Sequence, residues 1–193
     1  MDYLMVVNKE NKLSKNFIPK DLVLVPTIIK GSVDVDRKIY LNKVVATKWL
    51  ELKKYMDNLG YSIDISSVYI SYEYQEKLLS KFVEKKGLEE ALRIAALPGT
   101  SEHQTGLCFD YEKVYFEEDK MKTGLKEDDI EYKIVKDIAY KYGFIIRYPN
   151  GKEKITGYKF EPWHLRYVGI QNAKEIYEND LTLEEYKTKI LTK

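Results

Sequence analysis

The sequence contains little cysteine, proline or glycine. Its 193 residues include 1 cysteine, 5 prolines and 10 glycines. A single cysteine cannot form a disulfide within the chain, so the sequence does not require an oxidising compartment. The prolines and glycines are scattered, which excludes a low-complexity chain and gives no sign of a linker between domains. We therefore expect one domain, over residues 1–193.

Long hydrophobic runs and an excess of charge are also missing. The longest apolar runs resemble Leu22-Val23-Leu24-Val25, far short of the roughly 20 residues of a membrane-spanning helix. The first residues lack the basic and apolar regions of a signal peptide. Lys and Arg total 32 against 31 for Asp and Glu, so the net charge of +1 gives no general attraction to nucleic acid. We expect no membrane span, no nucleic-acid partner and a cytoplasmic location.

Hydrophobic residues make up 44% of the chain, which is enough to form a core. Apolar residues at helical spacing, together with one capping box, predict helices at 40–59, 72–86, 88–97, 128–142 and from 182 onward. Apolar and β-branched runs predict strands at 22–25, 63–70, 106–115 and 144–148. The polar segment 116–129 is expected to be a surface loop. Because these elements do not form regular βαβ units, we predict an α+β fold with a central antiparallel sheet flanked by helices.

The residues that carry chemistry are few. The chain has 2 histidines, His103 and His164, and Asp110 follows His103 inside an apolar stretch. A carboxylate in a buried strand costs free energy unless it is paired or binds a cation. Two imidazoles and one carboxylate can hold a zinc ion and leave a fourth position for water. Glu161, three residues before His164, could then take a proton from that water. The sequence thus contains one set of groups for metal-assisted hydrolysis of an amide.

The same spacings also fit ordinary structural roles. A histidine near aromatic residues is often simply hydrogen-bonded, and Asp110 could pair with Lys113. A cysteine–histidine nucleophile is disfavoured because Cys108 stands at the opposite strand parity to His103 and beside bulky apolar residues. We predict that Cys108 is a buried, inert thiol. The motifs of serine hydrolases, P-loops and dinucleotide-binding folds do not occur.

Two segments resemble the motifs of a known family. The run SEHQTGLCFD, residues 101–110, resembles the S-x-H-x-x-G-x-x-x-D motif of the zinc D,D-peptidases, and EPWH, residues 161–164, resembles their E-x-W-H motif. The family includes the D-alanyl-D-alanine carboxypeptidases and dipeptidases of vancomycin resistance, of the VanX, VanY and VanXY types. The likeness to the VanXY type covers nearly the whole chain, including the segments 97–99, 142–149, 163–169 and 182–186.

This resemblance implies a function and a set of site residues. One Zn²⁺ per chain would be held on the sheet by three ligands, with a general base beside it and two residues binding the terminal carboxylate of the substrate: His103, Asp110 and His164, then Glu161, then Ser101 and Gln75. The substrate would be the D-Ala-D-Ala dipeptide or the pentapeptide precursor of peptidoglycan. Its hydrolysis would remove the target of vancomycin and confer resistance.

One segment departs from the family pattern. Residues 69–75 resemble the end of the family segment G-Y-R-S-Y-x-x-Q, but Val68 and Ile70 stand where the family has Gly and Arg. Losing one such donor typically costs ~10²–10³ in rate. Either the activity is weak, or Arg147 or Arg166 substitutes for the missing arginine, or the substrate differs. Ser67, where the VanXY type can carry Asp, favours a carboxypeptidase over a dipeptidase.

Two alternative functions remain open at this point. One is a non-catalytic zinc-binding domain of the same fold, which the missing arginine favours and Glu161 disfavours. The other is a related peptidoglycan hydrolase that releases D-serine or D-lactate analogues, or an endolysin-type endopeptidase. The compact length of the chain weighs against the endolysin.

Overall fold

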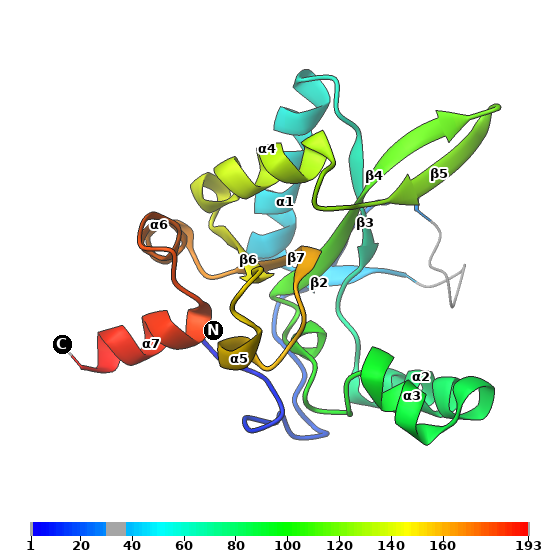
Figure 1. Ribbon diagram of the computed structural model, residues 1–193, viewed down its shortest axis with the longest axis vertical. Coiled ribbons are helices and arrows are strands. Elements are labelled where there is room, and N and C mark those ends of the chain that lie inside the picture. The colour runs from blue at the N-terminus through cyan, green and yellow to red at the C-terminus, as the bar shows by residue number, and fades with distance from the viewer. Residues whose placement is uncertain (1, 30–37, 193) are drawn as a thin grey trace.

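The computed structural model describes residues 2–29 and 38–192 (Figure 1). The strands are β1 (Leu22–Leu24), β2 (Tyr40–Asn42), β3 (Ile63–Ser67), β4 (Cys108–Glu117), β5 (Lys120–Gly124), β6 (Phe144–Tyr148) and β7 (Glu161–Tyr167). The α-helices are α1 (Lys43–Asn58), α2 (Tyr72–Lys86), α3 (Leu88–Ile94), α4 (Ile130–Ile138), α5 (Glu153–Thr156), α6 (Ile170–Glu178) and α7 (Leu183–Leu191). Two short 3₁₀ helices are η1 (Glu102–Thr105) and η2 (Ala139–Tyr142).

The centre of the fold is a five-stranded antiparallel sheet. Its strands run in the order β3-β4-β7-β6, and β5 also pairs with β4. One edge of β4 is shared, because Cys108–Asp110 pair with β7 and Lys113–Glu117 pair with β5. The short strands β1 and β2 form a separate two-stranded sheet. The prediction of an α+β fold with a central antiparallel sheet flanked by helices is confirmed.

Helix α1 covers one face of the sheet (Figure 1). Its fully buried Trp49 packs edge-on against Phe109 of β4, with ring centroids 4.9 Å apart, and Phe109 packs in turn against Phe144 of β6. Because side chains alternate along a strand, the neighbours of Phe109 on β4, Cys108 and Asp110, face the other side of the sheet. The larger hydrophobic cluster therefore occupies this face, whereas the other face carries polar side chains together with a second, smaller cluster that includes Ile145.

Local capping signals determine where two helices begin. Asn42 accepts a hydrogen bond from the Val44 amide, so α1 begins at Lys43 and the three residues before it form β2. At the other end of the chain, Thr182 and Glu185 form the predicted capping box at the start of α7. The capping box was correct, whereas the predicted start of the first helix was too early.

Several other predicted boundaries were wrong. The segment 116–129 is not one loop, because β4 continues to Glu117 and turns through Glu118 and Asp119, both with positive φ, into β5. Strand β7 was missed because apolar and polar residues alternate poorly along it. Helix α6 was also missed. The predicted strand 63–70 ends at Ser67. Within the described residues, no helix has both the length and the apolar character needed to cross a membrane.

Gly143 provides a test of this packing. It lies between η2 and β6 with φ of 88°, and a Cβ there would lie 2.6 Å from Cε2 of Tyr167. We expect Gly143→Ala to lower the free energy of unfolding by about 1–2 kcal/mol through left-handed strain and by about 1–3 kcal/mol more through overpacking. Urea denaturation would measure the loss.

Gly60 is the matched control. Its φ is 85°, but a Cβ there meets nothing within 4 Å. Gly60→Ala should show the strain of about 1–2 kcal/mol alone. Equal losses in the two variants would contradict the close packing of Gly143 against Tyr167.

Candidate active site

The site begins with a cross-strand pair of side chains. Asp110 of β4 is paired directly with His164 of β7 in the antiparallel register, so their side chains lie side by side on the same face. Asp110 Oδ1 is 2.9 Å from His164 Nδ1. Pairing of the two strands thus brings together residues that are far apart in the sequence.

His103 approaches this pair from η1. Gly106, with φ of 66°, ends η1 and turns the chain back into β4. His103 Nδ1 is 2.8 Å from the carbonyl oxygen of Val68. Because a carbonyl can only accept, the ring proton lies on Nδ1, and Nε2 is left to face Asp110 Oδ2 at 3.5 Å.

Glu161 reaches the same place through an irregular strand. Residues three apart in a regular strand point to opposite faces. Between β6 and β7, however, Ile146 pairs with Leu165 and Tyr148 pairs with Glu161. The stretch of β7 between these pairs is longer than the stretch of β6, so the pairing contains a bulge. This irregularity accompanies the approach of Glu161 Oε2 to 3.7 Å from His164 Nδ1. The Glu161 side chain is 29% exposed and that of His164 is 4% exposed, so Glu161 occupies the solvent side of the site.

A buried carboxylate lies behind His164. Glu102 Oε2 is 3.7 Å from His164 Nε2, and Oε1 accepts hydrogen bonds of 2.7 Å from both Arg147 and Arg166. Arg147 also donates to both carboxylate oxygens of Glu184. Burial opposes the charge on Glu102, but the two guanidinium groups outweigh it and hold the pKa of Glu102 well below its usual range. The carboxylate therefore remains charged against the imidazole. Glu102 was missed by sequence reasoning, although an acidic residue between Ser101 and His103 was visible.

The electrostatics of the site favour positive charge. Burial alone would lower the pKa of His103, but Cys108 and Asp110 beside it raise that pKa to about 10. Burial is likewise outweighed at His164, whose pKa is raised, and at Asp110, whose pKa is lowered by the two imidazoles. A bound cation can supply the positive charge that these protons otherwise bring.

The donor atoms fit a metal ion. Although Asp110 Oδ1 and His164 Nδ1 are close, they form no hydrogen bond, and Oδ1 has no hydrogen-bond partner among residues 2–29 and 38–192. His103 Nε2 and His164 Nδ1 both lie within 3.5 Å of this carboxylate. Nitrogen and carboxylate oxygen donors in this number suit a divalent transition metal with an open position. His103, Asp110 and His164 could therefore hold such an ion.

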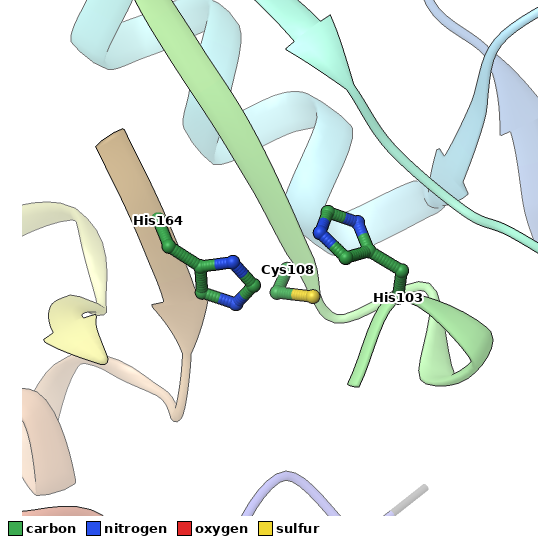
Figure 2. Close-up of side chains that lie close together, drawn as sticks. All are labelled: His103, Cys108 and His164. Carbon is green, nitrogen blue, oxygen red and sulfur yellow. The ribbon is translucent and has the colours of Figure 1, made fainter. Parts of the chain in front are cut away.

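Cys108 is buried, as predicted, but the expectation that its side chain points away from His103 is wrong. Its Sγ lies with ring nitrogens of His103 and His164 in a group whose atoms are all within 4.8 Å of one another (Figure 2). The parity argument failed because His103 belongs to η1 rather than to the strand. The alternative pairing of Asp110 with Lys113 does not occur either, since Lys113 forms an ion pair with Asp129.

The other candidate residues differ in how close they lie to this group of side chains. Arg147 and Arg166 are fully buried and occupied by Glu102, so their suggested role as substitutes for the missing arginine is wrong. Ser101 Oγ accepts a hydrogen bond from the His103 amide at 3.4 Å, which places it beside the site. Gln75 of α2 is buried, and its Nε2 donates to the carbonyl of Ala96 rather than to any of the grouped residues.

A cleft opens beside Asp110. Here β4 changes partner from β7 to β5, so the edge of the strand at Tyr111 and Glu112 is left between the two partners. The cleft has a volume of about 290 Å³. It is lined by Ser66, Asp110, Glu112, Gly124, Leu125 and Trp163. A small peptide entering this cleft would reach the carboxylate that His103 and His164 flank.

Comparison with known proteins identifies a family for this chain. The family model named VanY, D-alanyl-D-alanine carboxypeptidase, matches residues 38–170 of the chain. This match includes both histidines and covers well over half of the sequence.

The chain belongs to the VanY family.

Individual relatives are similar to this VanY-family chain in sequence and in fold. The bifunctional D-Ala-D-Ala dipeptidase and carboxypeptidase VanXYC of Enterococcus gallinarum is 35% identical over 186 residues, covering 96% of this chain and 94% of that protein. The solved structure of the LdcB LD-carboxypeptidase has a TM-score of 0.80 and 40% identity, covering 96% of this chain and 86% of that one. A variant of the D,D-pentapeptidase VanY from a VanB-type resistance cassette, solved with Zn(II), has a TM-score of 0.74 and 27% identity, covering 96% and 99%.

The buried carboxylate generates a prediction. Glu102→Gln keeps the shape of the side chain but leaves two buried guanidinium groups without a shared anion. We expect the free energy of unfolding to fall by about 3–5 kcal/mol in urea denaturation. Metal affinity of the folded variant, measured by titration, should fall about 10–100-fold because the carboxylate no longer supports His164.

Glu184→Gln is the control for this experiment. It removes a partner of Arg147 but leaves Glu102 and its approach to His164 in place. We expect some loss of stability and unchanged metal affinity. If both variants bound metal equally well, Glu102 would have no role in supporting the imidazole.

Proposed function

We propose that this VanY-family chain is a zinc-dependent carboxypeptidase that releases a C-terminal D-alanine from peptidoglycan peptides. The observation that carries the proposal is the convergence of His103, Asp110 and His164, with the Glu161 carboxylate 3.7 Å from His164 Nδ1. A structural metal site has no need of a further carboxylate at its solvent side, so Glu161 favours an enzyme over a non-catalytic domain.

Three residues would hold the metal. His103 would bind through Nε2, since Nδ1 is engaged by the Val68 carbonyl, and His164 would bind through Nδ1, since Nε2 faces Glu102. Asp110 would complete the set. When bound, one zinc ion would supply a Lewis acid and lower the pKa of a water in its open position. Support for zinc comes from the VanY relative that was solved with Zn(II).

Glu161 would move the proton. Burial raises its pKa above the usual value, and Asp110 nearby reinforces the rise while His164 opposes it. A carboxylate with a raised pKa is a better proton acceptor at neutral pH. Glu161 would take a proton from the attacking water and later deliver it to the nitrogen of the leaving D-alanine. Its partial exposure supports this role.

Two further residues are proposed to bind the carboxylate of the substrate. Ser101 adjoins η1, two residues before His103, and its hydroxyl can donate to the substrate while accepting from the His103 amide. Gln75 uses one N–H to bind Ala96 and has a second N–H for the substrate. Ile70, which is 7% exposed, offers no charge for this purpose.

Two kinds of substrate bond are candidates, one between two D-residues and one between an L-residue and a D-residue. The family model and the VanXYC relative favour hydrolysis of D-Ala-D-Ala termini. The 40% identity to the LdcB LD-carboxypeptidase favours a substrate in which a single D-alanine follows an L-centre. The D,D activity is the first candidate, and in the cytoplasm it would deplete the precursor that vancomycin binds.

The role of Glu161 can be tested by substitution. Glu161→Gln should keep bound metal at one ion per chain, measured by atomic absorption, and lose turnover by about 10²–10⁴-fold because no base accepts the proton. His103→Ala is the contrasting variant, which should lose the metal and the activity together. Near wild-type turnover in Glu161→Gln would show that another group is the base.

The substrate can be identified by a panel of three peptides. Release of D-alanine should be measured from the D-Ala-D-Ala dipeptide, from a pentapeptide stem ending in D-Ala-D-Ala, and from a tetrapeptide stem ending in one D-alanine, each with and without a chelator. We expect the pentapeptide to be cleaved fastest and the chelator to abolish release. Preference for the tetrapeptide would establish the L,D candidate, and expression of the protein would then leave vancomycin susceptibility unchanged. Release that persists with chelator would contradict a metal enzyme.

A further inference from the structure

Cys108 shares a strand face with Asp110. The two residues lie two positions apart on β4, and their partners on β7 are Arg166 and His164. Because side chains on a strand repeat with a period of two, both point away from the α1-covered face. The thiol is free and the residue is fully buried. It is therefore fixed at the inner end of the site, with Asp110 at the outer end.

The turn before β4 brings His103 against the thiol. Thr105 accepts a hydrogen bond from the Leu107 amide, and Gly106 reverses the chain, so η1 folds back on the start of the strand. Figure 2 shows the sulfur of Cys108 between the two imidazole rings. One ring nitrogen of each histidine and the Cys108 sulfur all lie within 4.8 Å of one another.

This placement gives the two histidines a choice of third ligand. His103 and His164 are common to a set completed by Asp110 and to a set completed by Cys108. Zinc in proteins accepts imidazole, carboxylate and thiolate, and thiolate is the soft donor that favours thiophilic metals. His164 is 3% exposed and its Nε2 has no hydrogen-bond partner among the described residues, so the inner part of the site is not saturated by protein contacts.

Building on the metal site of the proposed function, we propose that Cys108 Sγ is an alternative third donor, which with His103 and His164 binds a thiophilic metal ion in place of the set completed by Asp110. Binding converts the thiol and a divalent ion into a metal–thiolate bond and one released proton. His103, Cys108 and His164 make a set of three protein ligands, which leaves a fourth position open. Cys108 thus competes with Asp110 as the third ligand and directs the site toward thiophilic ions such as Cd²⁺.

The test is a Co²⁺ titration of the purified full chain, followed by absorption spectroscopy. Visible d–d bands report cobalt in the site, and a near-ultraviolet charge-transfer band reports a cobalt–thiolate bond. The chain has 1 cysteine, so such a band can come from Cys108 alone. We expect both signals in the wild type and loss of the charge-transfer band, with the d–d bands retained, in Cys108→Ser and Cys108→Ala.

Competition between Cd²⁺ and Zn²⁺ gives a second readout. We expect the ratio of Cd²⁺ to Zn²⁺ affinity to fall by about one order of magnitude in the serine variant, because the soft donor is lost. Wild-type d–d bands without a charge-transfer band would overturn the role of Cys108 and leave the proposed enzyme intact. Absence of all cobalt signals from the folded wild type would overturn the metal site itself. Both decisions use the wild-type protein, so they do not depend on the folding of a variant.

Discussion

The ion pairs of buried Glu102 with Arg147 and Arg166 are the interactions on which the inner part of the site depends. Two guanidinium groups share its Oε1, and its Oε2 faces His164. Arg166 donates further to the carbonyls of Tyr3 and Met5, which ties the start of the chain to β7. Removing one member of such a buried cluster leaves an uncompensated charge, which is far more costly than losing a surface ion pair. The cluster therefore places a buried negative charge behind the imidazole, and it does so with side chains from distant parts of the sequence.

The outer half of the site depends on irregular strand pairing. A regular β7 would direct Glu161 and His164 to opposite faces, and the bulge against β6 accompanies their approach. The change of partner along β4 leaves the cleft beside Asp110. The approach of Glu161 to His164 and the cleft beside Asp110 thus both coincide with interruptions in one sheet.

Ile70 stands where the family segment that this chain resembles has arginine. The segment before α2 holds His103 through its backbone, because the Val68 carbonyl faces Nδ1 and the Ile70 amide donates to the His103 carbonyl at 3.3 Å. Backbone contacts do not depend on which side chain the residue carries. Isoleucine at this position therefore leaves the contacts that hold His103 in place. Ile70 and Cys108 are thus both neighbours of His103, Ile70 through its backbone amide and Cys108 through its sulfur.

The sequence by itself determined the elements whose signals are local. Helical periodicity and capping residues predicted α1 and α7, and the two histidines, with Asp110 and Glu161 near them in the sequence, indicated a metal site. It did not determine the position of Cys108 between the imidazoles, the burial of both arginines or the part played by Glu102. Those features arise from pairing between β4 and β7 and from the fold of η1 against them, and long-range contacts leave no periodic trace in one chain. Residue chemistry was readable from the sequence, whereas the partner of each residue was decided by tertiary structure, because burial and charge pairing exist only after the strands have met.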